Sequence, residues 1–476
     1  MANIVCGSSP VFRRSTITFM ALLLTAAASP LWPQAAQTQG QDDEGLFDQG
    51  TLVTTQSQPA SPAEAAGESA QTAPPSDILL TSEAVTIGGS FDGKYTSTFS
   101  WNVFPGSFED LGAPDSRVFS DALGTELYFD ARPDANFRVY GKVGLYYPFS
   151  FVALEDASAY EDNPSIQIKE LFADFSWDRK LFFRAGKQSI KTGVGHFFSP
   201  ADVLSIQPIN PMDPTKKREG PVALQINYPF GLDNLYLYVL DTGVTDPAAL
   251  AISPHAQFIV GTTELTIGGL YQEDHVPRFL LTASYTASDF RFFHESVLTV
   301  GTDRTFVRTS SVPGSLETYT DDSTLYYTGT IGFIYSASSP DFTLAVQYLY
   351  NGDGYEDPSV IRDNAQAVIL LEKSGALSID DLYLRGLHYL AAAASFKEIG
   401  GSNSPWDASL FWIGDISDGS GEILPKLTWN VLDFASYTVS LSLGFPVYYG
   451  GTNSEYAPKG DTYAVSIEAH LAKAVF

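Results

Sequence analysis

The sequence predicts an all-β protein: a transmembrane antiparallel up-and-down β-barrel of about 16–18 strands, preceded by a disordered tether. Three observations support this prediction. Short segments alternate between apolar and polar residues, the connections between them alternate between short and long, and the last segment has one clean apolar face. The length of 476 residues does not require several domains, because a barrel grows by adding hairpins.

The alternation is clearest between residues 137 and 147. Phe137 and Leu145 occupy odd positions there, whereas Arg138 and Lys142 occupy even ones. The same period of two recurs in residues 324–336, 342–351 and 436–445. This is the period of a strand with one apolar and one polar face, not of a helix. No stretch reaches the roughly 18 consecutive apolar residues of a membrane-spanning helix, so we expect no helical span.

The connections favour a barrel over other β folds. Short polar turns are expected at residues 132–136, 178–180, 231–234, 287–289, 338–341 and 432–436. Longer segments are expected near residues 102–117, 149–164, 189–219, 242–255, 300–322, 352–385, 414–423 and 446–461. Outer-membrane barrels alternate short periplasmic turns with long outer loops in this way. A secreted β-sandwich or carbohydrate-binding protein would explain the strand pattern equally well, but not the asymmetry of the connections.

The N-terminus predicts export. Arg13 and Arg14 precede an apolar run from Ile17 to Ala28, which ends in a small-x-small pattern, as in a secretory signal peptide. We therefore expect a signal peptide over residues 1–28, a disordered linker rich in Gln, Ala, Ser and Pro over residues 29–77, and the barrel over residues 78–476. Cleavage would remove Cys6, the one cysteine of the chain, and with it any disulfide chemistry.

Composition and motifs exclude several classes of function. The formal net charge of −28 argues against nucleic acid as a partner, because phosphates would be repelled. The sequence contains no nucleophile elbow, zinc-protease motif or phosphate loop, so we expect no enzyme, cofactor or metal. Residues 351–357 have some character of a calcium loop, but Tyr355 stands where Asp or Asn would be wanted. We interpret them as a solvated loop.

The segment from Gly186 to Gly220 is the most informative. Its glycines 193 and 195 and its prolines 200, 208, 211 and 214 prevent regular structure through its middle. Its apolar residues need burial, so we expect residues 189–219 to fold inward across the barrel and narrow the pore. A purely structural alternative is a plug-like loop braced by an Arg218–Glu219 pair and an Asp202–lysine pair.

The same segment resembles a family. The run G-K-Q, G-x-G, several prolines and R-E-G is similar to the motif of porin-like barrels related to the alginate-export and phosphate-selective porins. The acidic, Phe-bearing tether is also similar to that of spirochaete envelope proteins. Many relatives have Trp where this chain has Thr192. The resemblance implies that five residues line or brace a constriction: Lys187, Gln188, Asp202, Arg218 and Glu219.

Further charges lie on the polar face of the predicted strands. We expect His196 to join them as a pore-lining residue. The strand residues of this set are Arg138, Lys142, Lys180 and Arg184, opposed by Glu170 and Asp174. Opposed charges across a pore create a field that filters polar solutes. A simply solvated interior explains the same residues.

The last strand completes the prediction. Val465, Ile467 and Leu471 form an apolar face, whereas Glu468 and His470 point inward. That pair could suggest a hydrolase, but a wet lumen explains it as well. Lys473 breaks the apolar face, and Phe476 falls on the inward parity. Either a bulge near Ala472 restores the register, or the terminal Phe476 extends past the wall for the assembly machinery.

Together these features predict a channel in the cell outer membrane for passive diffusion of small hydrophilic solutes. The expected partners are outer-membrane lipid, the barrel-assembly machinery through the last strand, and the solutes themselves. The sequence leaves open the oligomeric state, the ion selectivity and two alternatives: a barrel for a hydrophobic substrate, and a surface adhesin on a barrel scaffold.

Overall fold

The computed structural model describes residues 80–81, 84–134, 136–152, 165–206, 209–214, 218–241, 249–311, 315–401 and 403–475. The predicted signal peptide, the whole of the predicted linker (residues 29–77) and Phe476 lie outside these residues. A short strand β1 (Leu80–Thr81) pairs with the beginning of the first barrel strand.

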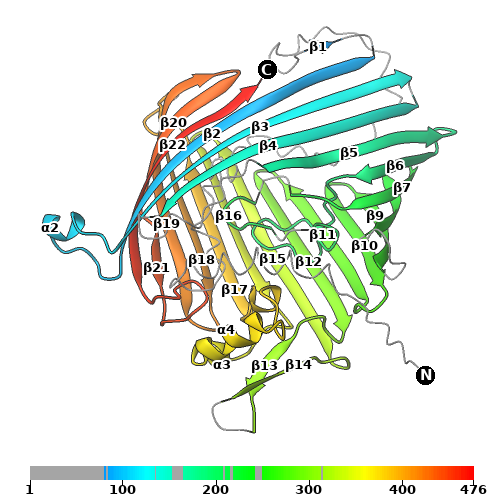
Figure 1. The fold of residues 1–476 in the computed structure, drawn as a ribbon. Coiled ribbons are helices and arrows are strands. Elements are labelled where there is room, and N and C mark those ends of the chain that lie inside the picture. Colours follow the sequence, from blue (N-terminus) through cyan, green and yellow to red (C-terminus); the bar gives the residue numbers. More distant parts are fainter. Residues whose placement is uncertain are drawn as a thin grey trace, which may run out of the picture.

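The wall is a closed antiparallel barrel of 18 strands, which confirms the predicted fold class (Figure 1). Each strand pairs with the next along the chain, and β2 pairs with β22 to close the wall. The first nine wall strands are β2 (Val85–Trp101), β3 (Ser116–Asp134), β4 (Phe137–Val152), β5 (Ser165–Trp177), β6 (Leu181–Lys187), β7 (Val222–Phe230), β8 (Asp233–Asp241), β9 (Leu250–Val260) and β10 (Thr263–Gln272). The others are β11 (Arg278–Ala287), β12 (Phe290–Val300), β15 (Leu325–Ser338), β16 (Asp341–Tyr350), β17 (His388–Phe396), β18 (Trp406–Asp415), β19 (Ser420–Phe434), β20 (Tyr437–Gly444) with its continuation β21 (Val447–Tyr449), and β22 (Thr462–Val475).

The connections alternate between two rims, as predicted. Most turns at one rim, the short-turn rim, contain two or three residues, and the longest segments leave the opposite, long-loop rim. Three predicted long segments are shorter than expected. Strands extend into residues 149–152 and 250–255, and only residues 416–419 separate β18 from β19. Gly419 adopts a φ of 72° in that connection, a conformation that lets a tight turn replace a loop.

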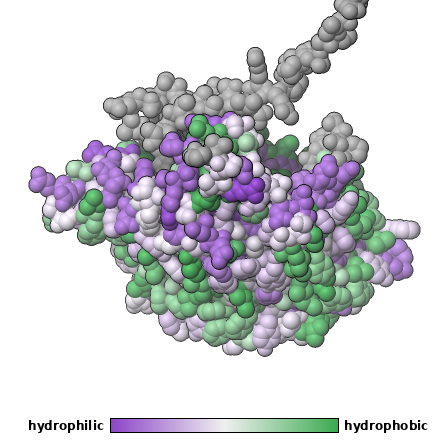
Figure 2. Space-filling model, turned by 90° about the horizontal axis from the view of Figure 1, so that it is seen from below, coloured by the Kyte–Doolittle hydropathy of each residue, from purple (hydrophilic) through white to green (hydrophobic). Residues whose placement is uncertain are grey.

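Successive side chains of the wall point to opposite sides. On β15, Ile331 is 60% exposed on the outside, whereas its neighbour Thr330 is 1% exposed on the inside. Large apolar side chains are exposed on most outward positions, among them Phe279, Leu298, Leu410, Leu441 and Ile467. Figure 2 shows hydrophobic residues dominating the lower part of one face and hydrophilic residues gathered across its upper part. The outside therefore has the apolar character that lipid contact requires.

A small folded cap lies beyond the long-loop rim (Figure 1). It contains the hairpin β13 (Phe306–Thr309) and β14 (Leu316–Tyr319), and the helices α3 (Ser359–Arg362), α4 (Ala365–Lys373) and η4 (Asp380–Leu382). Phe306, Ile361, Val368 and Leu382 are among its buried core residues. A separate short helix, α2 (Phe108–Leu111), lies between β2 and β3. None of the helices among the described residues is long and apolar enough to cross a membrane.

The seam between β2 and β22 contains the predicted bulge. Gly93 pairs with Leu471 and Phe91 with Ala474, so two residues of β22 oppose Asp92 alone. Inside the seam, Glu468 lies 2.7 Å from Lys94 Nζ and 3.3 Å from Lys426 Nζ. The inward placement of Glu468 and His470 agrees with the sequence pattern. One carboxylate thus joins β2, β19 and β22 where the barrel closes.

Replacement of Glu468 tests this closure. In Glu468→Gln the nearly buried Lys94 and Lys426 lose the carboxylate that they share, so we expect the free energy of unfolding in urea to fall by on the order of 3 kcal/mol. The exposed pair Arg308–Glu317 supplies the control, because Glu317→Gln should cost less than about 1 kcal/mol. Equal stability of the two variants would contradict this role of Glu468.

Candidate functional site

The described residues of the segment between β6 and β7 (188–206, 209–214 and 218–221) lie inside the barrel. The segment starts and ends on neighbouring strands, yet Phe197 and Phe198 pack against Tyr389 of β17 and Phe411 of β18, on the far side of the wall. Its teal trace runs across the middle of the barrel in Figure 1. The polar, proline-rich sequence cannot form another strand pair, so the segment depends on contacts with the inner wall.

The first of these contacts is a buried carboxylate. Glu295 of β12 is 0% exposed and points inward. Its Oε1 accepts hydrogen bonds from the backbone N–H groups of Val194 and Gly195, each at 2.5 Å, and from Ser199 Oγ at 2.9 Å. Its Oε2 accepts from the N–H of Ala201 at 2.8 Å. A loop without regular structure has unpaired N–H groups that must be satisfied when buried, and Glu295 satisfies several of them.

The second contact is a buried amide. Gln347 of β16 is also 0% exposed, and its Oε1 accepts from the N–H groups of His196, Phe197 and Phe198 at 3.0, 2.6 and 3.3 Å. Its Nε2 donates to the Phe198 carbonyl and to Thr330 Oγ1, both at 2.6 Å. The amide offers both donors and acceptors, which fits a turn that presents both kinds of backbone group.

Two glycines permit this close approach. A Cβ at Gly195 would lie 1.9 Å from the carbonyl oxygen of Phe198 and 3.1 Å from Gln347 Nε2. At Gly220, where the segment rejoins the wall, a Cβ would lie 1.7 Å from the carbonyl oxygen of Gln188. Neither site has room for a side chain. The glycines singled out in the sequence therefore serve backbone packing against side chains and backbone of the barrel.

Ion pairs brace the two ends of the segment. Asp202 accepts from the N–H of Thr192 at 3.0 Å and from Ser205 Oγ at 3.2 Å, and forms a salt bridge with Arg218. Lys187 pairs with Glu219. The predicted pairs, Arg218 with Glu219 and Asp202 with a lysine, are therefore wrong. Arg218 and Glu219 are adjacent in the sequence, and each instead meets a charge that the fold of the segment brings opposite to it.

Three of the expected constriction residues are buried, wholly or in part: Gln188 and Asp202, which the resemblance implied would line or brace it, and His196, which we expected to line the pore. Gln188 is 1% exposed, and its Nε2 donates to the carbonyl oxygen of Ala223 at 3.0 Å. The ring of His196 packs edge-on against Phe197, and its Nε2 is buried without a hydrogen-bond partner. The Asp202 side chain is 0% exposed. These side chains hold the segment in place rather than face the lumen. In the opposite sense, Ile206, which we expected to be buried, is 59% exposed.

A partly exposed ionic wall remains on the other side of the lumen. Arg138 of β4 lies 2.8 Å from Asp130 and 3.4 Å from Asp174, and Arg184 of β6 lies 2.6 Å from Asp174. Lys142 pairs with Glu126. Both Asp130 and Glu126 lie on β3 and were missed by the sequence analysis. Aromatic rings interleave with these charges, since the Arg184 guanidinium lies 4.2 Å from the ring centroid of Phe172.

The remaining predicted residues divide between the wall and its rim. Glu170 is buried on β5, and its Oε1 accepts weakly from the N–H of Ser189 at 3.4 Å. Lys180 does not line the lumen. It lies in the turn between β5 and β6, its side chain is 72% exposed, and it pairs with Asp178 beside it. The error arose from extending the strand parity one residue into a turn.

Two cations missed by the sequence analysis differ from the rest. Lys191 is exposed at the beginning of the segment, and Arg291 lies on the inward face of β12. They lie close enough to repel each other electrostatically. Within the described part of the chain, neither has a carboxylate at salt-bridge distance. The lumen cations of the ionic wall are ion-paired, so this pair contributes positive charge that is not neutralised by direct contact.

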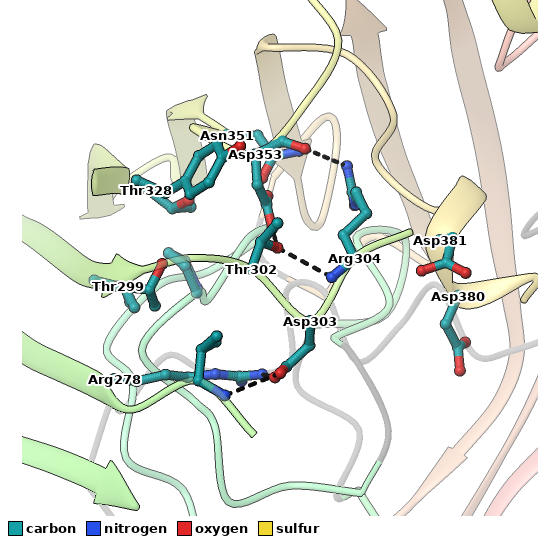
Figure 3. Close-up of a pocket in the computed structure, with 14 residues that line it drawn as sticks. Arg278, Thr299, Thr302, Asp303, Arg304, Thr328, Asn351, Asp353, Asp380 and Asp381 are labelled. Carbon is teal, nitrogen blue, oxygen red and sulfur yellow. Dashed lines mark hydrogen bonds and ion pairs between the residues drawn. The ribbon is translucent and has the colours of Figure 1, made fainter. Parts of the chain in front are cut away.

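A recess of about 360 Å³ lies between the segment and the long-loop rim (Figure 3). Pro200 of the segment forms part of its lining. Arg278 and Asp303 form a 3.1 Å ion pair in it, and Arg304 donates to the carbonyl oxygens of Asp353, Tyr383 and Leu384. The other polar lining residues are Thr299, Thr302, Thr328, Asn351, Asp380 and Asp381. The recess is hydrophilic, and acidic residues outnumber basic ones in it. No group of acidic, His or Cys residues among those described could hold a metal ion.

Comparisons with known proteins give structural likeness at low identity. No family model matches the chain, and no curated protein matches it. Among solved structures, OccAB1 of Acinetobacter baumannii has 13% identity and a TM-score of 0.47, over 81% of this chain and 96% of that one. The outer membrane protein OprD of Pseudomonas aeruginosa has 9% identity and a TM-score of 0.43, over 80% and 92%. A triple mutant of the Rhodopseudomonas blastica porin has 8% identity and a TM-score of 0.39, over 81% of this chain and 99% of that one. Function must therefore be inferred from this chain's own residues.

Substitution of Gly195 tests the packing of the segment. Because a Cβ would collide with the backbone of Phe198, we expect Gly195→Ala to lower the free energy of unfolding by about 1–3 kcal/mol. Gly106 has no atom closer than 3.9 Å to its Cβ position, so Gly106→Ala should stay within about 0.5 kcal/mol. Urea unfolding of the purified variants in detergent measures both. An unchanged Gly195→Ala protein would show that the segment is not packed as described.

Proposed function

We propose that this protein is an outer-membrane channel for passive diffusion of small hydrophilic solutes, with residues 188–221 as its constriction. One observation carries the proposal: a segment anchored across the interior of a closed barrel faces a partly exposed wall of ion pairs. The side chains of Arg138, Lys142 and Lys187 are 25–27% exposed, so water or a polar solute reaches them.

The outer surface supports a location in the outer membrane. Strands satisfy their backbone groups within the closed wall, which is the condition for a β protein to span lipid. The apolar outward side chains then face the hydrocarbon, and the strand β22 would present the signal for barrel assembly. The polar lumen disfavours the alternative of a hydrophobic substrate. Among the described residues, the ionic wall offers charged side chains and no continuous apolar surface along which such a substrate could pass.

The charges suggest how solutes would be filtered. The recess near the long-loop rim carries an excess of acidic residues. Lys191 of the segment and Arg291, beside the short-turn rim on β12, have no salt-bridge partner among the described residues. A solute crossing the channel would pass from negative to positive potential within a narrow lumen, where fields are weakly screened. The similarity to alginate-export and phosphate-selective porins remains a prediction and names no solute here.

Planar-bilayer recordings test the channel and its constriction together. We expect ohmic conductance steps from the native protein and steps about twofold larger from the variant Glu295→Ala/Gln347→Ala, because release of the segment widens the path. Gln225 points inward from β7 and makes no contact with the segment among the contacts described, so Gln225→Ala should conduct like the native protein. A correctly folded native protein that never conducts would overturn the proposed function.

The unpaired cations should set the sign of the deeper filter. In Lys191→Gln/Arg291→Gln, loss of positive charge should shift the reversal potential in a KCl gradient toward cation preference. Lys373→Gln removes one exposed lysine charge at the end of α4, away from the lumen pair, and serves as the control for the loss of a lysine charge elsewhere on the protein. If the double variant had the reversal potential of the native channel, these two side chains would not face the conducting path.

A further inference from the structure

A buried cluster of charges joins three connections at the long-loop rim. Arg385 comes from the segment between β16 and β17, Asp418 from the connection between β18 and β19, and Glu455 from the segment between β20 and β22. Asp415, the last residue of β18, lies beside them. The side chains of Arg385 and Asp418 are both 0% exposed, and that of Glu455 is 12% exposed. The cluster is thus nearly closed to water.

Direct hydrogen bonds hold these residues together. Arg385 Nη2 donates to Asp418 Oδ2 at 3.0 Å and to the carbonyl oxygen of Asn453 at 2.8 Å. The N–H of Glu455 donates to Asp418 Oδ2 at 2.8 Å. Glu455 Oε2 accepts from Tyr389 Oη at 2.7 Å and from the N–H of Arg385 at 3.3 Å. Each of the three connections is therefore tied to the other two through one network.

The charges in this network do not balance. Asp415, Asp418 and Glu455 are three carboxyl groups, and Arg385 is the one guanidinium that contacts them among the described residues. Asp415 is 1% exposed, and its Oδ2 has no hydrogen-bond partner. Three ionised carboxylates in a nearly dry site would repel one another strongly. A proton on one of them relieves that repulsion.

Glu455 is the best placed to hold the proton. Burial raises its pKa to about 8, against the opposing effect of Arg385 and with a further increase from Asp415. Asp418 raises it too, whereas the hydrogen bond from Tyr389 lowers it. Two more titratable groups, Tyr383 and Tyr456, also face Glu455, and Glu422 faces Tyr456. These are the ionisable groups that act on the site from the surrounding elements.

We propose that the Arg385–Asp418–Glu455 cluster is a proton-linked latch that keeps the three connections of the long-loop rim closed while Glu455 is protonated and loosens them when it ionises. The latch also controls the recess. Asn351, Asp380 and Asp381 line the recess and belong to the same β16–β17 segment as Arg385. Loosening of this segment would open the recess on its long-loop side.

The direction of the pH dependence follows from linkage. When the latch is open, water surrounds Glu455 and its pKa returns toward its ordinary value of 4.5, whereas the closed latch holds it at about 8. A group that binds its proton more tightly in the closed state stabilises that state fully at low pH. This stabilisation decreases as the pH rises above 4.5 and is lost once the pH passes about 8. Alkaline pH should therefore open the latch.

A nitroxide at position 451 reports on the latch without any channel measurement. Gly451 is exposed on the β20–β22 segment, and a Cβ there meets no atom closer than 4.0 Å. In a Cys6→Ser, Gly451→Cys protein we expect an immobilised electron paramagnetic resonance spectrum at pH 5 and a severalfold larger mobile fraction at pH 9. Heat-modifiable migration in gels confirms that the barrel is folded at both pH values.

Glu455→Gln is the decisive variant, because the amide mimics the protonated carboxyl group. It should keep the label immobilised at both pH values, whereas Asp322→Asn, which changes an exposed acid of the same rim, should respond like the parent. A label whose mobility is independent of pH in the parent would overturn the latch, and so would a Glu455→Gln protein that loosens like the parent. A folded protein that passes this test but does not conduct would contradict only the proposed function.

Discussion

The burial of the Glu295 carboxylate is the constraint on which the interior depends. A buried charge is costly unless hydrogen bonds surround it, and the donors here come from backbone N–H groups and a hydroxyl of a loop that has no ladder of its own. The wall side chain and the backbone of the segment therefore satisfy each other's hydrogen bonds. Without the segment, Glu295 and Gln347 would face water. Without these two side chains, the N–H groups of residues 194–198 and of Ala201 would be buried without these partners.

This arrangement divides the lumen into two unlike halves. Strands β12 and β15–β19 are covered by the segment, and their inward positions include apolar residues such as Phe293, Ile334 and Phe411. The inward side of strands β3–β6 carries ion pairs with aromatic rings between them, and the segment contacts these strands through its two ends, at Ser189 and Glu219. The acidic recess and the cluster at Arg385 then lie on the long-loop side of the segment. In this account the segment sets the width of the pore, the ionic wall and the recess set its charge, and the cluster at Arg385 controls its closure at the long-loop rim.

The wall was predictable because a period of two is local. Strand faces, the alternation of rims and the bulge at Ala472 all follow from neighbouring residues, so the sequence contains what is needed to predict them.

The two side chains that hold the segment, Glu295 and Gln347, were not predictable in this way. Glu295 and Gln347 contact residues that lie about a hundred or more positions earlier, and no alternation reveals which inward position meets a loop. One signal was present: inward positions beside Glu295 are apolar, as Phe293 and Val297 are, which indicates a covered wall. The pairing of Arg218 and Asp202 was missed for the same reason, since it depends on how the segment folds.

Amide hydrogen exchange tests the central claim, that two wall side chains hold the segment across the lumen. The N–H groups of residues 194–198 and of Ala201 donate to buried oxygens although they belong to no strand, so their exchange in detergent should be nearly as slow as that of wall strands such as β16. The segment of residues 102–115, at the long-loop rim, should exchange much faster. Slow exchange of these amides, lost at Val194, Gly195 and Ala201 in Glu295→Ala, would support the claim. Exchange of these amides as fast as in residues 102–115 would contradict it.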